Sequence, residues 1–279
     1  MSANYRLAQR LGRPTSIVRA GTASFGGGGF TLVGGPCAIE GADQIGLAAR
    51  GVRAAGGAML RGGAYKPRTS PYDFQGLGDE GLPLIAEAGA RHGLLVVVEV
   101  LAVAQVPLVA EYADMIQIGA RNMQNVPLLR AAAATGRPIL LKRGPSATLD
   151  ELLLAAEYIL LEGNDRVVLC ERGIRAFDPN TRNVCDLGGA LRLRELTHLP
   201  VILDPSHASG RQSLIEPLTL AAAAAGLDGA IVETHPNPRQ ARCDADQAID
   251  LADFARLAAR VRAVRAALDD ALEPAAAAS

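Results

Sequence analysis

Eight short apolar segments recur along the chain at a regular spacing, and each is closed by a polar or glycine-containing end. The segments are FTLVGGP (30–36), AMLRGG (58–63), LLVVVEV (94–100), MIQIGA (115–120), PILLKRG (138–144), RVVLCERG (166–173), PVILDPSH (200–207) and GAIVETHP (229–236). Short apolar runs of this kind are typical of strands that are buried on both faces. Ala- and Leu-rich stretches with helical spacing separate them, as in 149–163 and 213–226. The pattern predicts parallel strands with a helix after each strand.

Eight such units in 279 residues predict a (β/α)8 TIM barrel. A doubly wound sheet is the alternative, but it needs a phosphate-binding glycine motif after its first strand, and GGPCAIEG (34–41) is not one. We therefore expect a single catalytic barrel over residues 31–270. An extension over residues 1–30 is expected to form a short hairpin that caps the barrel floor. The Ala-rich tail over residues 271–279 is expected to be frayed.

The composition excludes several classes of function. A net charge of −1 gives no electrostatic support for a nucleic-acid partner, and aromatic residues at 4% with no Trp do not build a stacking platform. No apolar run approaches the length of a membrane span. The four cysteines have no CxxC spacing, which is typical of a protein of the reducing cytoplasm. We expect a cytoplasmic protein that acts on small molecules, without nucleic-acid or membrane partners.

The chemically unusual residues share one position in each unit, at the end of the strand or just after it. In a barrel these eight ends converge on one rim, where active sites are built. The residues are Cys37, Arg61, Lys66, Glu99, Arg121, Lys142, Arg143, Glu171, Arg172, Asp204, His207, Glu233 and His235.

The stretch RGGAYKPRTSPYDFQG (61–76) places three cations in eight residues within a segment rich in Gly and Pro. Such a stretch is either a solvated surface loop or an anion clamp. Because its cations share the rim with Arg121, Lys142 and Arg172, the clamp is favoured, and more than one anionic ligand group is implied. The arginines of the last helical stretch (256, 260, 262 and 265) are interpreted instead as a solvated face.

The same rim offers a thiolate, an imidazole and two carboxylates, which are suitable ligands for a divalent metal ion. The candidates are Cys37, His207, Glu233 and Asp244. Each also has a structural interpretation: Cys37 as a small core residue, His207 as a hydrogen-bonded core histidine, and Asp244 as the N-cap of a helix over 246–258. Their location on one rim favours a metal site.

The chain resembles the type I 3-deoxy-D-arabino-heptulosonate 7-phosphate (DAHP) synthases, and most closely the branch whose short members consist of the catalytic barrel alone. The resemblance extends over about 200 residues in family order. It is carried by GGPCAIEG (34–41), RGGAYKPRTSPYDFQG (61–76), QIGARNMQN (117–125), LLKRG (140–144), CERGIRAFDPNTRN (170–183), DPSHASGR (204–211) and VETHPNP (232–238). One stretch departs from the family pattern, because ARCDADQAID (241–250) stands where the family shows a sequence closer to ALSDGPQSL.

The resemblance implies a metal-dependent, aldol-like condensation of phosphoenolpyruvate with erythrose 4-phosphate and water, the first step of the shikimate pathway in aromatic amino acid biosynthesis. It implies one divalent metal ion that is held by Cys37, His207, Glu233 and Asp244. Mn²⁺ is the preferred ion, and Co²⁺, Fe²⁺ and Zn²⁺ are the alternatives. Lys66 is implied as the proton donor, with a pKa lowered by the cationic rim, and His207 as a second catalytic residue. Phosphoenolpyruvate is implied to bind Arg61, Lys66, Glu99, Arg121, Lys142 and Arg172. Erythrose 4-phosphate is implied to bind Arg68 and Thr69.

Two alternative functions stay open. One is the related synthase of 3-deoxy-manno-octulosonate 8-phosphate, although that family typically reads KANRSS where this chain has KPRTSP. The other is a non-catalytic regulatory paralogue, although the metal and cation positions are all present. We further expect a homo-oligomer, either a dimer or a tetramer, and a chorismate mutase as a regulatory partner protein. Because few residues precede the first strand, we expect aromatic end products not to inhibit the isolated enzyme.

Overall fold

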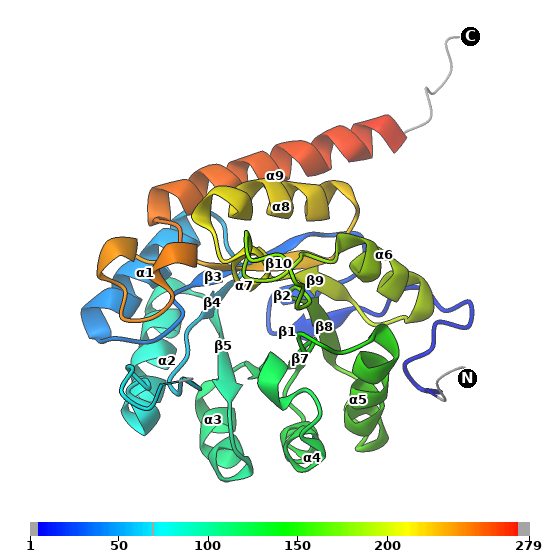
Figure 1. Cartoon of the computed structure of the whole chain (residues 1–279), viewed down its shortest axis with the longest axis horizontal. Helices are drawn as coiled ribbons and strands as arrows, with labels where there is room; N and C mark the ends of the chain where they lie inside the picture. Colours follow the sequence, from blue (N-terminus) through cyan, green and yellow to red (C-terminus); the bar gives the residue numbers. More distant parts are fainter. Residues whose placement is uncertain (1–4, 69, 273–279) are drawn as a thin grey trace.

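The computed structural model describes residues 5–68 and 70–272. Eight parallel strands close into a barrel in the order β10-β3-β4-β5-β6-β7-β8-β9 (Figure 1). The strands are β3 (Thr31–Gly35), β4 (Met59–Arg61), β5 (Leu95–Val100), β6 (Met115–Ile118), β7 (Ile139–Lys142), β8 (Val167–Glu171), β9 (Val201–Leu203) and β10 (Gly229–Glu233). Each strand lies inside one of the eight apolar segments, so the predicted (β/α)8 barrel is confirmed.

Helices follow the strands and surround the barrel (Figure 1). They are α1 (Ala42–Ala54), α2 (Gly81–His92), α3 (Val106–Tyr112), α4 (Val126–Ala134), α5 (Leu149–Leu161), α6 (Leu187–Leu196), α7 (Pro205–Ser209), α8 (Gln212–Ala224) and α9 (Leu251–Leu272). No helix within the described ranges is both long and apolar enough to cross a bilayer.

The last helix begins later than the sequence predicted. Residues Ala245–Gln247 form a single 3₁₀ turn, and α9 starts at Leu251. Between them Ile249 makes a parallel bridge to Thr234, which holds this segment against the end of the barrel. Asp244 makes no capping hydrogen bond, so its interpretation as the N-cap of a helix over 246–258 is wrong.

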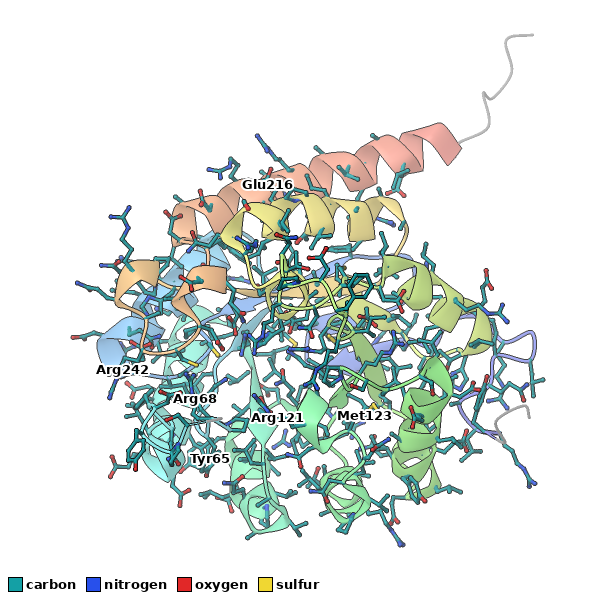
Figure 2. All side chains as sticks on the ribbon, viewed as in Figure 1. Tyr65, Arg68, Arg121, Met123, Glu216 and Arg242 are labelled. Atoms are coloured by element: carbon teal, nitrogen blue, oxygen red, sulfur yellow. The ribbon has the colours of Figure 1, made fainter. Side chains whose placement is uncertain are left out.

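The arginines of α9 have two different roles. Glu216 of α8, labelled in Figure 2, forms ion pairs with Arg256 and Arg260 on the exposed surface. Arg262 donates to the carbonyl of Ala55, which caps α1, at 2.9 Å. Arg265 donates to Ala223 in the last turn of α8. The interpretation as a solvated face holds for Arg256, Arg260 and Arg262, which are exposed, whereas Arg265 is half-buried. Arg262 and Arg265 also satisfy carbonyls at helix C-termini.

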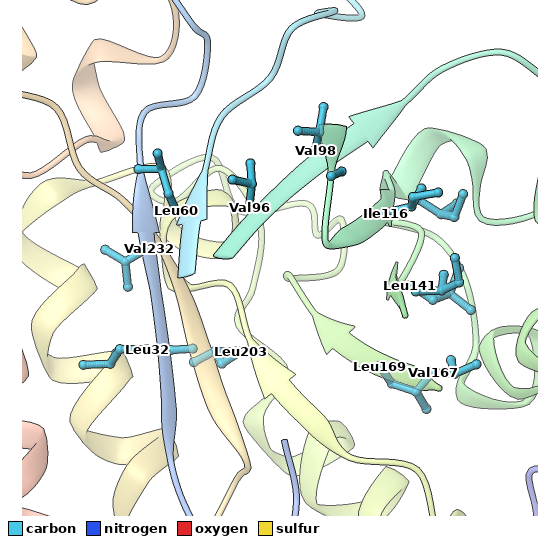
Figure 3. Packing of buried hydrophobic residues seen from close by; sticks show 14 of the residues in the cluster. Leu32, Leu60, Val96, Val98, Ile116, Leu141, Val167, Leu169, Leu203 and Val232 are labelled. Carbon is cyan, nitrogen blue, oxygen red and sulfur yellow. The ribbon is translucent and has the colours of Figure 1, made fainter. Parts of the chain in front are cut away.

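The strands alternate between two hydrophobic layers. Side chains such as Leu60, Val98 and Leu141 point outward and pack beneath the helices (Figure 3). Their neighbours along each strand point inward and form a second cluster inside the barrel. That interior cluster contains Val33, Met59, Val97, Met115, Leu140, Val168, Cys170, Ile202 and Ile231.

The N-terminal extension closes the floor of this interior layer. Its strands β1 (Val18–Ala20) and β2 (Ala23–Phe25) pair antiparallel, and Val18 and Phe25 belong to the interior cluster. The predicted hairpin is therefore confirmed, and it replaces the solvent that would otherwise contact the lower layer of side chains.

The same alternation determines what lies at the opposite end. Two residues beyond an inward apolar side chain, a strand again points inward, so polar residues near the strand ends also face the interior. This arrangement brings Arg61, Glu99, Gln117, Lys142 and Glu233 together above the apolar layer. The barrel therefore has a dry floor and a charged upper layer.

Glycine at position 35 is required where β3 passes β4. Gly35 has φ 144°, and a Cβ there would lie 2.0 Å from the carbonyl oxygen of Arg61. We expect Gly35→Ala to lower the free energy of unfolding by roughly 1–3 kcal/mol, the cost of overpacking. A Cβ added at Gly46 in α1 would meet no atom within 4 Å, so Gly46→Ala is expected to stabilise by about 1 kcal/mol. Urea unfolding of both variants measures the two opposite shifts, and equal shifts would contradict the argument.

Candidate active site

A cavity of about 470 Å³ opens at the C-terminal rim of the barrel. Figure 2 labels two of its lining residues, Arg68 on the loop after β4 and Arg121 on the loop after β6. The lining is strongly cationic, and Asp73, Glu99 and Asp244 are its acidic members. The cationic members are Lys66, Arg68, Arg121, Lys142, Arg172, Arg175 and Arg182. Of the predicted cationic rim, Lys66, Arg68, Arg121, Lys142 and Arg172 thus line one cavity, and Arg61 does not.

Arg175 and Arg182 were not among the predicted site residues. Both lie in the irregular loop after β8, within the CERGIRAFDPNTRN stretch. Because this loop has no regular periodicity, the sequence does not indicate which of its side chains face the cavity. The three Arg residues of this stretch are the sequence feature that could have indicated further cations in the cavity.

The buried cations of the upper layer are paired with carboxylates. Nη1 of Arg61 donates to Oε1 of Glu233 at 2.7 Å, and both side chains are almost fully buried. Nζ of Lys142 lies 2.5 Å from Oδ2 of Asp204. Burial alone would raise the pKa of Asp204, but the hydrogen bonds from His207 and the charge of Lys142 outweigh it and hold that pKa well below its usual value. Arg61 does not line the cavity in this structure, so its contact with a substrate stays a prediction.

Arg121 and Arg172 are different, because neither side chain has an ion pair or hydrogen bond within the part of the chain that the structure describes. Arg172 is buried, and this burial lowers its pKa. A buried cation without a counter-ion is costly unless an anion binds to it. Arg172 is therefore the strongest indication that the cavity accepts an anionic ligand, and Arg121, although exposed, adds a second cation without a partner.

The four predicted metal ligands come together beside the cavity. One ligand atom from each of Cys37, His207, Glu233 and Asp244 lies within 4.8 Å of all the others. Sγ of Cys37 donates to Oδ2 of Asp244 at 3.0 Å, and Nε2 of His207 lies 3.3 Å from Oε1 of Glu233. One sulfur, one nitrogen and two carboxylate donors fit a borderline divalent ion.

The protonation states of this cluster also suit a metal. Burial lowers the pKa of His207, which favours the neutral imidazole, and Nδ1 of His207 lies 2.8 Å from Oδ2 of Asp204. This contact leaves Nε2 directed at Glu233, as in carboxylate–histidine–metal arrangements. Burial alone would raise the pKa of Glu233, but His207 and Arg61 outweigh it and lower that pKa. The hydrogen bond with Cys243, in which Cys37 keeps its proton, and burial raise the pKa of Cys37, so a metal must displace its proton.

Gln247 was missed by sequence reasoning and supports the cluster. Its Nε2 donates to Oε2 of Glu233 at 2.7 Å, and its Oε1 accepts from Nη1 of Arg182 at 2.7 Å. Arg182 also lies 3.6 Å from Oδ1 of Asp244. The amide of Gln247 thus connects Glu233 to Arg182, and Arg182 in turn lies beside Asp244.

Lys66 is located as predicted, but its electrostatics are not. It lines the cavity, and its Nζ donates to the carbonyl of Cys37 at 3.1 Å. Burial alone would lower the pKa of Lys66, but attraction by Cys37 and Glu99 outweighs burial and the repulsion by Arg61, so the pKa is raised. The predicted lowering by the cationic rim is wrong, because the acidic neighbours lie closer to Lys66 than the sequence could reveal.

Arg68 is partly exposed at the edge of the cavity. Its Nη1 donates to Sγ of Cys243 at 2.6 Å, and its Nη2 lies 3.1 Å from Oδ2 of Asp73. An anionic ligand at the rim can replace Cys243 and Asp73 as the partners of Arg68. Thr69, the second residue predicted to hold the sugar phosphate, lies outside the described residues.

A closed parallel barrel, a cationic cavity at its C-terminal rim and an adjoining set of four metal-type ligands define an enzyme that acts on anionic small molecules. The DAHP synthetase I family matches residues 15–269. The chain belongs to this family, and its described residues form one barrel.

Similar proteins include the phospho-2-dehydro-3-deoxyheptonate aldolase of Thermotoga maritima, which is 46% identical over 95% of this chain and 78% of the relative. The 2-dehydro-3-deoxyphosphooctonate aldolase of Rhodopseudomonas palustris is 32% identical over 88% of this chain and 91% of the relative. The crystal structure of the Thermotoga enzyme superimposes with a TM-score of 0.92 at 45% identity, covering 95% of this chain and 78% of that one. Its truncated form gives a TM-score of 0.88 at 42% identity and is covered to 97%.

Arg143 is a rim cation whose contacts indicate a structural role. Its Nη1 contacts Glu171 and Asp186, each at 2.8 Å, and it lies outside the cavity lining. We expect Arg143→Met to lower the free energy of unfolding by about 3–5 kcal/mol, because Glu171 is left buried without a charged partner and keeps only the hydrogen bond from the backbone N–H of Gly173. The exposed pair Arg130–Glu162 provides the control, and Arg130→Met should cost about 0–1 kcal/mol.

The loss of unfolding free energy in Arg143→Met, called the deficit below, should also depend on pH. Burial raises the pKa of Glu171 in the folded protein, so the folded state binds more protons than the unfolded state above the ordinary carboxyl pKa. Stability contributed by this group therefore falls as pH rises through that window. Loss of Arg143 raises the pKa of Glu171 further, and the deficit of Arg143→Met should be larger at pH 8 than at pH 5. Urea unfolding at both pH values measures it, and a deficit that grows on acidification would refute this reasoning.

Proposed function

We propose that this enzyme condenses phosphoenolpyruvate with erythrose 4-phosphate and water to give 3-deoxy-D-arabino-heptulosonate 7-phosphate and phosphate. The observation that carries this proposal is the unpartnered pair Arg121 and Arg172 beside the four-ligand cluster in one cavity. The anionic groups of two substrates match the unpaired arginines of the cavity. A divalent ion matches the four-ligand cluster beside them. The 46% identity to the Thermotoga aldolase supports the same reaction.

We assign the part of the cavity lined by Arg121 and Arg172 to phosphoenolpyruvate. Arg121 and Arg172 provide guanidinium groups for its phosphate or carboxylate, since a planar fork binds either group in a bidentate manner. Lys66 and Lys142 add point charges, with Glu99 nearby. Arg61 contributes to this part through Glu233, whose orientation it holds.

We assign the outer part to the phosphate of erythrose 4-phosphate. Arg68 is the described candidate, with Thr69 following it in the sequence. When Arg68 binds phosphate it exchanges its contacts with Cys243 and Asp73 for a stronger anion. The loop after β4 thereby serves both substrates, with Lys66 facing one and Arg68 the other.

We assign one divalent metal ion to the ligands Cys37, His207, Glu233 and Asp244, and Mn²⁺ is the preferred ion. Such an ion supplies Lewis-acid polarisation of the aldehyde carbonyl. Asp204 keeps the imidazole of His207 in the tautomer that presents Nε2, and Arg61 and Gln247 keep both oxygens of Glu233 in place. Preorganised charges of this kind need no rearrangement during the reaction.

In the carbon–carbon bond-forming step, C3 of phosphoenolpyruvate attacks C1 of the aldose. Lys66 is protonated because its pKa is raised, and it donates its proton to the developing alkoxide oxygen. Water then adds to C2, and the resulting hemiketal phosphate expels inorganic phosphate. We place His207 as the group that assists the addition of water. The side-by-side fixation of two anions against their repulsion contributes much of the rate enhancement.

A phosphate-release assay with phosphoenolpyruvate and each of two aldoses tests the proposed function directly. Turnover is expected with erythrose 4-phosphate and not with arabinose 5-phosphate. Preference for arabinose 5-phosphate would establish the octulosonate activity of the 32% identical relatives instead. No turnover with either aldose would indicate a non-catalytic paralogue. The homo-oligomer and the chorismate mutase partner stay predictions.

The metal assignment makes a further prediction. Cys37→Ala is expected to bind a divalent ion at least ten-fold more weakly and to lose turnover, because the thiolate is one of four donors. Metal content by atomic emission and activity are measured on the same sample. Cys185→Ala is the matched control, since Cys185 lies outside the cluster. A Cys37→Ala enzyme that retains both metal and full activity would remove Cys37 from the site.

The two parts of the cavity predict opposite kinetic effects. Arg68→Ala should raise the KM for erythrose 4-phosphate by about ten- to a hundred-fold, since a charge-assisted phosphate contact is worth roughly 1.5–3 kcal/mol. Arg121→Ala should raise the KM for phosphoenolpyruvate by a similar factor. Steady-state kinetics with each substrate varied in turn separates the two effects. Equal weakening of both substrates in both variants would show that the assignment of two subsites is incorrect.

A further inference from the structure

The end of the barrel opposite the active site carries a second cavity, which we call the floor cavity. It has a volume of about 430 Å³ and lies where β6, β7 and β8 begin. One wall is the turn of the N-terminal hairpin, and the other is the segment between α4 and β7. Its charged lining residues are Arg19, Asp114, Arg137 and Arg166. The proposed reaction uses none of them.

Other arginines at this end of the barrel have a structural role, because helix C-termini lie here and leave carbonyl groups without partners. Arg10, Arg262 and Arg265 donate to carbonyls at the C-terminal ends of α6, α1 and α8. Arg19 and Arg166 differ, because neither side chain has a hydrogen bond or an ion pair within residues 5–68 and 70–272. Helix capping therefore does not account for the positive charge that these two residues bring to the floor cavity.

The remaining arginine of the cavity is held in place and still has free donors. Nε of Arg137 donates to the carbonyl of Ala110 in α3 at 3.1 Å, and its two terminal nitrogens have no hydrogen bond to any described residue. Buried Asn164 joins Arg137 to Arg166, since its Nδ2 donates to the carbonyl of Arg137 at 2.8 Å and its Oδ1 accepts from the backbone N–H of Arg166 at 3.1 Å. Nη2 of Arg166 lies 3.6 Å from where a Cβ on Gly136 would stand. The two guanidinium groups are thus carried by backbone segments that one buried amide fixes together.

The charge of the floor cavity indicates a dianion. Asp114 is its acidic lining residue, and Oδ2 of Asp114 accepts from the backbone N–H of Val96 at 2.7 Å. The three arginines therefore leave two positive charges in excess. Guanidinium groups bind phosphate oxygens in a bidentate manner. We propose that the floor cavity binds the phosphate group of a small molecule, either as free phosphate or as a phosphate monoester.

A phosphate at this position joins the hairpin to the barrel. Arg19 belongs to β1, whereas Arg137 and Arg166 stand just before β7 and β8. The hairpin also supplies Val18 and Phe25 to the interior cluster, so its closure completes the lower layer of the barrel. Binding therefore stabilises the closed floor. Because the floor cavity and the active site lie at opposite ends of the strands, this inference does not rest on the proposed function.

Anomalous diffraction locates the ligand. Crystals of the full chain, grown without sulfate or phosphate, are soaked in millimolar selenate, a tetrahedral dianion whose selenium atom scatters anomalously. The expected result is a selenium peak in contact with Arg137 and Arg166 in the floor cavity. A floor cavity that stays empty in the soaked crystals overturns the proposal.

Urea unfolding in phosphate measures the same site in solution, because a ligand of the folded state raises the free energy of unfolding. The double variant Arg19→Ala/Arg166→Ala should bind phosphate at the floor at least about ten-fold more weakly and keep only the stabilisation that comes from the active site. The control Arg50→Ala/Arg53→Ala removes two exposed arginines of α1 and should respond like the wild type. An equal response of all three proteins would mean an adventitious ion only and would overturn the proposal. Phosphate release by the floor variant should be unchanged, so failure of this proposal is distinguishable from failure of the proposed function.

Two further ligands identify the source of the phosphate group. Glycerol 3-phosphate replaces inorganic phosphate in the same unfolding experiment. A larger stabilisation that depends on Arg19 and Arg166 supports a phosphorylated metabolite, and a smaller one supports free phosphate. Acetate at the same concentration is the control for charge. Stabilisation by acetate equal to that by phosphate would refute the assignment to a dianion.

Discussion

The buried ion pair between Arg61 and Glu233 is the interaction on which the upper half of the barrel depends. Both residues come from strands whose neighbouring inward side chains are apolar, so neither charge can reach bulk water. A charge in this environment is tolerated only with a partner and further hydrogen bonds. Glu233 obtains them from Arg61 on one oxygen and Gln247 on the other. The loop after β10 is thereby fixed to the barrel, and Asp244 with it.

The same requirement separates the rim cations into two groups. Lys142 and Arg143 neutralise Asp204, Glu171 and Asp186, and so contribute to the architecture. Arg121 and Arg172 have no such partner among the described residues, and they leave positive charge for a ligand to neutralise. A surface of scattered charges would show no such division. The pairing pattern therefore says more about anion binding than the number of cations does.

Much of the fold and of the candidate site could be predicted from the sequence. The eight strands, the hairpin at the floor and the cluster of Cys37, His207, Glu233 and Asp244 all follow from apolar segments and from what stands at their ends. The start of α9 was placed too early, because its helical pattern does not show that Ile249 bridges back to Thr234. The raised pKa of Lys66 was missed for a similar reason, since distances between loops are not encoded in local spacing.

The sequence by itself determined the eight apolar segments and the identity of the residues at the strand ends, because these are local properties of consecutive residues. Closure of the barrel decided which of these residues meet. It brought Cys243 to 3.3 Å from Cys37 across more than two hundred residues, and it assigned Arg61 to Glu233. Contacts between distant loops depend on the registers of eight strands at once. Chemical partners at the rim are therefore fixed by the tertiary structure and not by the segments that carry them.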